Sequence, residues 1–204
     1  MLSGFAWPLV KDTRARWRRA TAGTRPLGEE GGYIVPRATL RESCPVNEAA
    51  KQSVLRLFPY GLYSVTVHLR DEDHGMLANW VTQAAFDPPM VAVAVENDAR
   101  TLAMIRDARS FAVSVLGEGQ RELAGKLGRS SAKAPTKLKG IKTRQGPVYK
   151  SPILAEALGW LECRLVGTLP AGDHTVVLGE VVEAGVEREG NVLTLRAAGF
   201  KYSG

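Results

Sequence analysis

The chain has 204 residues, of which 45% are hydrophobic and 24% charged, values typical of a globular protein of one or two domains. No apolar run approaches the roughly 20 residues of a membrane helix, and residues 1–10 lack the basic start of a signal peptide. The two cysteines, Cys44 and Cys163, cannot build a disulfide framework. These features predict a cytoplasmic protein with no membrane partner.

The formal net charge of +6 is concentrated in one segment. Residues 129–150 contain no Asp or Glu, and their basic residues are Arg129, Lys133, Lys137, Lys139, Lys142, Arg144 and Lys150. Sites for single-stranded nucleic acid interleave aromatic side chains with such charges, but this segment offers only Tyr149. We therefore expect no nucleic-acid partner, and a solvated surface is the simplest interpretation of this basic segment.

Residues 1–45 show little hydrophobic periodicity and predict an N-terminal extension with a short helix over residues 11–22. Further helices are expected over residues 48–58, 101–108, 120–127 and 152–158, with Asn97 or Asp98 as the N-cap of the second of these. Strands are expected over residues 62–69, 75–85, 90–95, 111–116, 161–169, 175–184 and 192–197, the last two joined by a hairpin at 189–191. Many strands with few intervening helices favour an antiparallel barrel over a doubly wound parallel sheet.

Two segments match nucleotide-binding motifs only in part. Residues 117–122 follow a strand and open a helix, as a dinucleotide fingerprint does, but Glu122 stands where the third glycine is needed. Residues 119–127 resemble a phosphate-binding loop, but Leu127 replaces the Ser or Thr that would bind magnesium. The histidines and cysteines have no metal-ligand spacing, so we expect no metal site.

One apolar run contains polar residues that a packed barrel does not require. Asn79, Thr82 and Gln83 interrupt the strand expected over residues 75–85. A strand with one solvent-facing side would account for them. The wall of a ligand cleft would account for them equally well, and both interpretations stay open.

Two turn segments carry further candidates. Arg100 and Thr101 stand at the expected start of a helix, where unpaired backbone N–H groups suit either ordinary capping or a bound phosphate. His174 follows a Gly-Asp turn at the entrance to a strand. A histidine at such a position could orient an anionic or hydride-carrying ligand.

In this order, the segments resemble the flavin reductase-like family, the FMN-binding split barrels. The matching parts are residues 57–63, 75–89, 97–101, 111–116 and 161–181. The resemblance implies a mainly β domain over residues 46–204, built as an antiparallel, Greek-key split barrel with a few short helices. It also implies a homodimer with the flavin near the subunit interface.

The resemblance implies a set of site residues. The flavin would be held by Met76, Ala78, Asn79, Trp80, Val81, Thr82 and Gln83, and its phosphate by Arg100 and Thr101. His174 would be the catalytic residue on the nicotinamide side. Trp80 is bulkier than the small polar residue that many reductases of this family carry.

The implied activity is an NAD(P)H-dependent flavin reductase with FMN as the cofactor and NADH or NADPH as the hydride donor, which could supply reduced FMN to a monooxygenase. An FMN-binding electron carrier that receives electrons from a protein partner is the main alternative. A basic binding module that has lost the flavin is a third. For a protein of this kind, the basic segment 129–150 becomes a candidate lid or steering patch for phosphate-bearing cofactors.

Overall fold

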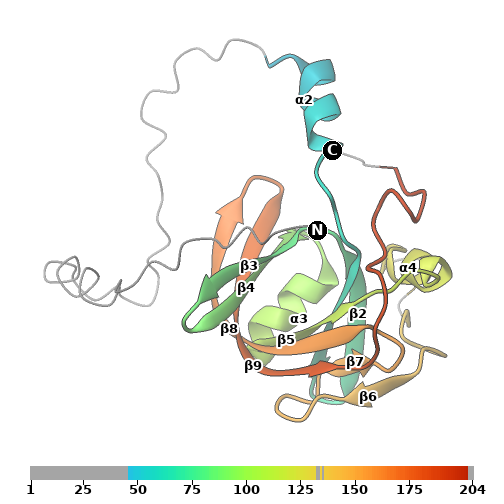
Figure 1. Cartoon of the computed structure of the whole chain (residues 1–204). Coiled ribbons are helices and arrows are strands. Elements are labelled where there is room, and N and C mark those ends of the chain that lie inside the picture. Colours follow the sequence, from blue (N-terminus) through green and yellow to red (C-terminus); the bar gives the residue numbers. More distant parts are fainter. Residues whose placement is uncertain (1–45, 132–133, 135, 202–204) are drawn as a thin grey trace, which may run out of the picture. The chain divides into compact units, whose positions relative to one another are not determined.

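A computed structural model describes residues 46–131, 134 and 136–201, so the extension expected over residues 1–45 and its helix lie outside the described residues. The described helices are α2 (Glu48–Leu55), α3 (Arg100–Ala108) and α4 (Arg121–Leu127) (Figure 1). The described strands are β1 (Tyr63–Leu69), β2 (Glu72–Ala78), β3 (Val81–Phe86), β4 (Pro89–Glu96), β5 (Ser110–Val115), β6 (Thr143–Gln145), β7 (Pro152–Leu154), β8 (Gly159–Ala171) and β9 (His174–Val186). None of these helices is long and apolar enough to cross a membrane.

Seven strands form one antiparallel sheet in the order β2-β1-β5-β8-β9-β4-β3. Its two edge strands, β2 and β3, follow each other in the chain with only Asn79 and Trp80 between them. The two edges must therefore meet at this junction, so the sheet curls into a barrel that is split between β2 and β3. The antiparallel split barrel expected from the sequence is confirmed.

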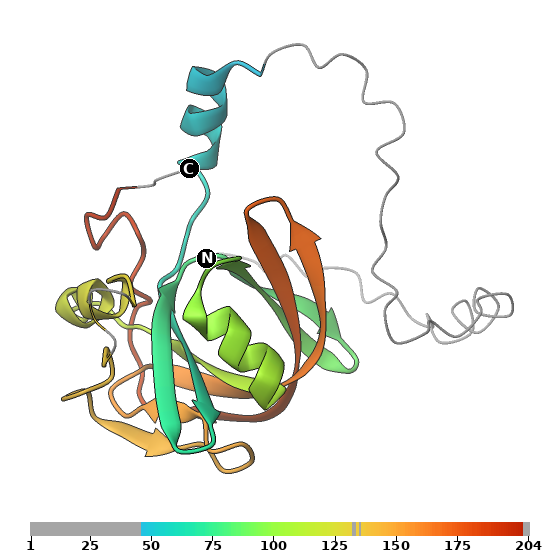
Figure 2. The same cartoon turned by 180° about the vertical axis from the view of Figure 1, so that it is seen from behind.

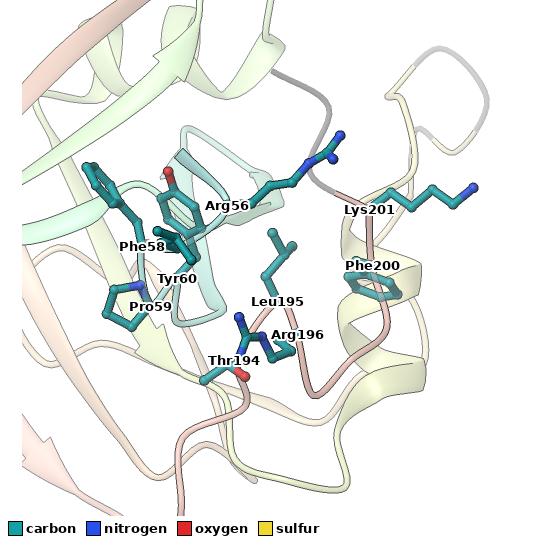
Figure 3. A pocket seen from close by; sticks show the side chains of 10 residues that line it. Arg56, Phe58, Pro59, Tyr60, Thr194, Leu195, Arg196, Phe200 and Lys201 are labelled. Atoms are coloured by element: carbon teal, nitrogen blue, oxygen red, sulfur yellow. The ribbon is translucent and has the colours of Figure 1, made fainter. Parts of the chain in front are cut away.

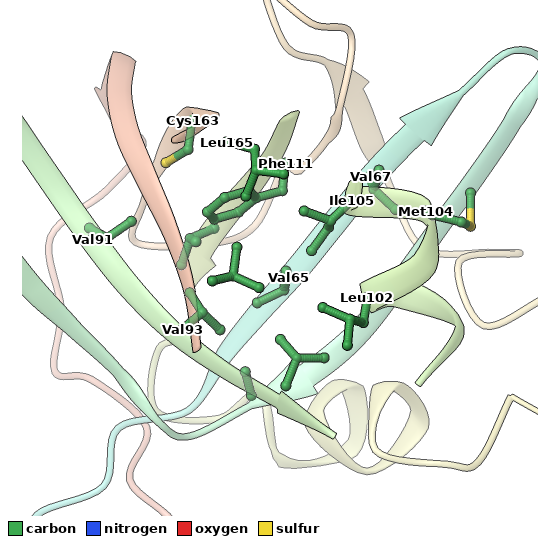
Figure 4. Close-up of a cluster of buried hydrophobic side chains, with 14 residues drawn as sticks. Val65, Val67, Val91, Val93, Leu102, Met104, Ile105, Phe111, Cys163 and Leu165 are labelled. Carbon is green, nitrogen blue, oxygen red and sulfur yellow. The ribbon is translucent and has the colours of Figure 1, made fainter. Parts of the chain in front are cut away.

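The core lies on the concave face of this sheet, where alternate residues of each strand point inward. Figure 4 shows the valines of β1 and β4 facing Leu102 and Ile105 of α3, and Figure 2 shows α3 in front of the curved sheet. Phe111 of β5 is fully buried. A Cβ atom at Gly179 would lie only 2.4 Å from the Phe111 ring, so β9 can pass this ring only with a glycine.

The opposite face of β1, β5 and β8 is covered by the chain between α4 and β8. Glu162 of β8 is fully buried on this face and accepts hydrogen bonds from the backbone N–H groups of Val148 and Tyr149, both at 2.8 Å. Gly146 leaves the space for this carboxylate, because a Cβ atom there would lie 2.3 Å from Glu162 Oε1. Glu162 thus holds the turn before β7 against the sheet.

The helix predicted over residues 152–158 is wrong. Pro152–Leu154 forms strand β7, which pairs with β6. Ile153 and Leu154 are both buried, at 0% and 1% exposure. An extended segment buries neighbouring side chains on two sides, and this packing outweighs the local helical preference.

The strand predicted over residues 192–197 is also wrong. This segment makes only isolated bridges, from Val192 to Gly117 and from Thr194 to Gly61. Because no strand follows β9 among the described residues, the hairpin expected at residues 189–191 is wrong as well, and β9 pairs with β8 and β4 instead.

Two further differences concern the elements beside the barrel seam. Residues 75–85 were expected as one run, but they belong to two strands, β2 and β3, that lie at opposite edges of the sheet. Helix α3 has Ala99 as its N-cap, without a side-chain capping hydrogen bond, so the prediction of Asn97 or Asp98 is wrong.

The described part of the basic segment packs against the barrel. Lys137 is only 6% exposed, and burial lowers the pKa of its ammonium group. Leu138 lies against Gly75 of β2, and Arg144 pairs with Glu187 at 2.5 Å. None of the described residues of the basic segment lines either of the two cavities described in the next section. The structure therefore gives no support to a lid formed by residues 136–150.

Candidate functional site

A cavity of about 390 Å³ lies at the seam of the barrel, a volume within the range of small-molecule sites. We call it the strand cavity. Its lining comes from the segment before β1, the β2–β3 junction, β4 and β9: Phe58, Pro59, Tyr60, Gly61, Tyr63, Asn79, Trp80, Val81, Thr82, Ala92, Ala94 and Val176. The lining is mainly apolar and aromatic, with polar groups at the β2–β3 junction.

Strand β4 provides the floor of the strand cavity through a strict alternation of residue size. Val91, Val93 and Val95 point into the core. Ala92 and Ala94 point the other way and line the cavity. Since successive residues of a strand face opposite sides, one strand packs the core with valines and leaves open space with alanines.

The β2–β3 junction forms the rim of the strand cavity. Asn79 and Trp80 lie outside both strands, and the Trp80 carbonyl accepts a hydrogen bond from the Ala94 N–H group at 3.0 Å. Val81 and Thr82 continue the rim along β3. The structure thus brings four of the predicted flavin-binding residues together at one cavity.

The other predicted binding residues lie elsewhere. Met76 and Ala78 pack in or against the barrel core. Gln83 is exposed and donates from its side-chain amide to the Ala85 carbonyl at 3.3 Å. None of these three lines either cavity described here.

The predicted phosphate-binding pair also lies outside the strand cavity. Arg100 forms an ion pair with Glu72 of β2, and both carboxylate oxygens are within hydrogen-bond reach of its guanidinium. Thr101, in the first turn of α3, is only 1% exposed.

His174 contacts a residue of the cavity rim, Trp80, rather than the cavity itself. It is the first residue of β9. The centroids of its imidazole ring and of the Trp80 ring are 4.7 Å apart, and the two rings are tilted by 45°. Its Nδ1 atom is 2.7 Å from the Asp173 carboxylate. This contact lowers the pKa of the Asp173 carboxyl group below its ordinary value. His174 therefore contacts the cavity rim through Trp80 and does not itself line the cavity.

Asn97 anchors the turn that carries His174. Its side-chain amide donates to the Gly172 carbonyl at 3.0 Å, and its Oδ1 atom accepts from the Thr175 hydroxyl at 2.7 Å. The Asn97 N–H group also donates to the Asp173 carbonyl at 3.0 Å. Two segments that the sequence analysis singled out separately, 97–101 and 172–175, are thus joined, and Asn97 is a positioning residue rather than a cap.

A second cavity, of about 770 Å³, lies beside the strand cavity, and we call it the terminal cavity. It is formed by the segment after α2 and by the last described residues of the chain (Figure 3): Arg56, Leu57, Phe58, Pro59, Tyr60, Thr194, Leu195, Arg196, Phe200 and Lys201. Phe58, Pro59 and Tyr60 line both cavities.

Neither a reactive thiol nor a metal centre accompanies these cavities in the described part of the chain. Cys163 is fully buried in the core, and burial raises the pKa of its thiol to about 12. The thiolate is the nucleophilic form of cysteine, so this side chain is a core residue. Among the described residues, no cluster of His, Cys, Asp or Glu could hold a metal ion.

Comparison with known proteins assigns the family. Residues 55–202 match the flavin reductase like domain. The chain belongs to this family. The resemblance seen in the sequence is therefore confirmed, and all residues that line the two cavities lie within the matched flavin reductase like domain.

Three proteins illustrate the range of this flavin reductase like family. The chain is 33% identical over 156 residues to the "4-hydroxyphenylacetate 3-monooxygenase, reductase component" of Thermus thermophilus, covering 76% of this chain and 96% of the relative. It is 35% identical over 144 residues to the "High molecular weight rubredoxin" of Moorella thermoacetica, covering 69% of this chain and 62% of the relative. The structure of the NADH:FAD oxidoreductase of Streptomyces globisporus is similar, with a TM-score of 0.65 and 32% identity over 74% of this chain and 90% of that one.

Several residues that line the strand cavity of this flavin reductase like domain were not predicted from the sequence. Phe58, Tyr60 and Tyr63 lie in a segment that carried the family resemblance, but they were not predicted as site residues. Ala92 and Ala94 were missed because residues 90–95 read as a continuous apolar strand. The alternation of large and small residues in that strand was the signal that could have identified them.

Proposed function

We propose that this protein is a flavin reductase that binds FMN in the strand cavity and uses NADH or NADPH as the hydride donor. The observation that carries the proposal is the open floor of Ala92 and Ala94 beneath the rim of residues 79–82. The reductases among its relatives support the assignment to the flavin oxidoreductase enzymes.

The residues of the strand cavity suit a planar, mostly apolar ring with polar edges. Ala92 and Ala94 leave space for the ring face, and aromatic side chains at Tyr60 and Tyr63 border it. The Asn79 amide and the Thr82 hydroxyl supply donors and acceptors for the polar edge of a flavin. A bound flavin would accept a hydride at N5 from the nicotinamide, and it would pass the electrons to a later acceptor.

The protein's contribution to this reaction is positioning. Residues of the β2–β3 junction and of β4 would hold the flavin in the strand cavity. His174 contacts Trp80 of the rim, and we assign it to the nicotinamide, whose carboxamide or phosphate its imidazole would orient. Hydride transfer requires no general base at the cavity.

The decisive experiment uses the purified full chain. We expect it to bind FMN, seen as quenching of flavin fluorescence, and to oxidise NADH or NADPH only when flavin is added. Stopped-flow reduction with each nicotinamide would identify the preferred donor. A chain that neither binds flavin nor oxidises either nicotinamide contradicts the proposal.

A flavin-binding electron carrier is the second candidate. The Trp80–His174 contact favours it, because the two rings occupy space at the rim where a nicotinamide would approach. Tight retention of flavin, reduction by a protein donor and no reaction with nicotinamide would support this alternative. A colourless protein with salt-sensitive nucleic-acid binding would instead indicate a basic binding module.

We also propose that the protein acts as a homodimer and serves a monooxygenase. Phe58 lines the cavities yet is 54% exposed, and Phe86 at the tip of the β3–β4 hairpin is 89% exposed. Large exposed apolar side chains are typical of surfaces that a partner covers. Light scattering of the full chain, and coupled hydroxylation assays with a two-component monooxygenase, test these two proposals separately.

A further inference from the structure

Lys137 is the one lysine that is buried in the described part of the chain, and its side chain has no partner there. It is only 6% exposed, and neither a hydrogen bond nor an ion pair involves its ammonium group. By contrast, the exposed side chains of Lys51 and Lys142 pair with Glu48 and Glu156. Burial without a partner disfavours the charged form and lowers the pKa of the Lys137 ammonium group. A larger share of this side chain is therefore a neutral, nucleophilic amine than at an exposed lysine.

A second buried titratable side chain lies close to Lys137. His74 of β2 is 1% exposed, and its Nε2 atom is 3.3 Å from the Ser131 hydroxyl oxygen. Burial lowers the pKa of His74, and the charges of Lys137 and then Arg100 lower it further, while Glu72 acts in the opposite direction. The imidazole is therefore neutral near pH 7 and can accept a proton. An amine and a base are thus buried close enough for the charge of one to act on the other.

The turn that carries Lys137 is fixed against β2 by its neighbours. The Lys139 N–H group donates to the Thr136 carbonyl at 3.0 Å, so Lys137 lies inside a tight turn. A Cβ atom at Gly75 of β2 would lie 3.0 Å from Leu138 Cδ2, so Leu138 packs directly over this glycine. Leu138 also packs against one of the hydrophobic clusters of the barrel. The backbone on which the Lys137 side chain depends is therefore anchored beside the strand of His74.

The Lys137 amine is covered by the protein but not sealed off from solvent. Among the described residues, the fully enclosed side-chain oxygen and nitrogen atoms without a partner are the hydroxyl oxygens of Ser64 and Ser151. The Lys137 Nζ atom is not one of them, so it keeps a small contact with solvent. A side chain that is only 6% exposed is a poor target for a bulky acyl donor, whereas a molecule of three atoms can reach it. Carbon dioxide is such a molecule, and it reacts with neutral amines.

We propose that Lys137 is a modification site for carbon dioxide, which its amine binds as a carbamate with His74 as the proton acceptor. The lone pair of Nζ forms a bond to the carbon atom, one C–O π bond opens to give a carboxylate, and one N–H proton passes to the imidazole. Neutral amine, carbon dioxide and neutral imidazole thus become a carbamate anion and an imidazolium cation, with no oxidant or reductant. The new negative charge beside His74 favours its protonated form, the reverse of the effect of an ammonium group. The resulting ion pair gives both buried groups a partner.

The first test traps the carbamate on the full chain. The protein is equilibrated with ¹³C-labelled bicarbonate near neutral pH, the carbamate is alkylated with a trialkyloxonium salt, and the adduct is located by peptide mass spectrometry. We expect the trapped adduct on Lys137 and a carbamate signal in the ¹³C NMR spectrum that Lys137→Met removes. Lys139→Met is the matched control, because Lys139 is an exposed lysine of the same turn, and it should keep the signal. No adduct on Lys137 of the unchanged chain, or an equal adduct on the exposed lysines, overturns the proposal.

The second test concerns His74. We expect His74→Gln to raise the carbon dioxide concentration needed for half modification by about tenfold, because the variant lacks the charged partner of the carbamate. His68→Gln is the matched control, since His68 pairs with Asp73 instead. An unchanged half-modification concentration in His74→Gln overturns the assignment of His74 as the proton acceptor.

Stability provides a readout that is independent of trapping. At fixed pH and ionic strength, carbon dioxide should raise the thermal unfolding midpoint of the unchanged chain and of Lys139→Met but not that of Lys137→Met, since a ligand that binds only the folded state stabilises it. An equal rise in all three proteins overturns the proposal. Neither Lys137 nor His74 lines the strand cavity, so a chain that forms the carbamate and reduces no flavin keeps this site and loses only the proposed function.

Discussion

The imidazole of His174 packs against the indole of Trp80, with 4.7 Å between the ring centroids, and so joins the start of β9 to the rim of the strand cavity. The contact crosses between two segments that are almost a hundred positions apart in the chain. It brings an imidazole and a large aromatic surface together at the rim of the strand cavity.

Replacing His174 should affect the nicotinamide more than the flavin. We expect His174→Gln to raise the KM for the nicotinamide about fivefold, which corresponds to the loss of a hydrogen bond to the donor of about 1 kcal/mol. The dissociation constant for FMN should not change. Steady-state kinetics with flavin titration measure both, and His68→Gln, which is not among the residues that line the cavity, is the matched control. An equal loss of flavin affinity would show that His174 supports the flavin site instead.

A larger side chain on the cavity floor should block the flavin without unfolding the barrel. We expect Ala94→Leu to weaken FMN binding by about tenfold or more while changing the free energy of unfolding by about 1 kcal/mol or less, because the new atoms enter open space. Flavin fluorescence titration and urea denaturation provide the two measurements.

Val93→Ala is the control from the other face of the same strand. It should lower the free energy of unfolding by about 2–3 kcal/mol, because it opens a cavity in the core, and leave flavin affinity unchanged. If both substitutions weaken flavin binding equally, the two faces of β4 are not independent.

Removing the buried carboxylate of Glu162 should destabilise the barrel. Glu162→Ala leaves two backbone N–H groups without their acceptor, so we expect a loss of about 3 kcal/mol in the free energy of unfolding. Glu162→Gln keeps one acceptor oxygen and should cost less. Glu183→Gln, at an exposed position of β9, should change stability by about 0.5 kcal/mol or less. Equal stability of the Ala and Gln variants would contradict this account.

Acid should destabilise the barrel through His74. This side chain is 1% exposed, and burial, followed by the nearby charges of Lys137 and Arg100, lowers its pKa from 6.5, while Glu72 acts in the opposite direction. As the pH falls below 6.5, the unfolded chain takes up a proton that the folded barrel does not, so the free energy of unfolding decreases until the folded-state pKa is passed.

The measurement is the thermal unfolding midpoint as a function of pH. We expect His74→Gln to flatten the decrease that the unchanged protein shows below pH 6.5. The control variant His68→Gln should retain it, since His74 is unchanged in that variant. A decrease of the same size in all three proteins would assign the acid sensitivity to other groups.

The sequence predicted the elements of the barrel well where alternation and turn residues agreed. The strands at β1, β4 and β5 and the helix α3 were found within a residue or two of their expected bounds. The strand β7 was missed because its apolar side chains become buried on both sides only after the sheet has formed. The break between β2 and β3 at Asn79 and Trp80 was missed for a similar reason, because no local pattern shows that these two strands lie at opposite edges of the sheet.

The site could be predicted only in part. The rim residues 79–82 stood out because polar groups interrupted an apolar run. The aromatic wall at Phe58 and Tyr60 did not, since aromatic side chains are equally typical of a core. The role of Asn97 depends on hydrogen bonds to a hairpin 75 positions away, which chain order alone does not reveal.

The alternation of valine and alanine along β4 has a consequence for how this protein can change. Ala92 and Ala94 line the cavity and are not part of the buried core cluster. Substitutions there can therefore change the shape of the cavity, and with it the ligand that is accepted, while the fold remains intact. A library restricted to these two positions would test which ligands the cavity can accept. The same scaffold could thus diverge in chemistry without first acquiring extra stability.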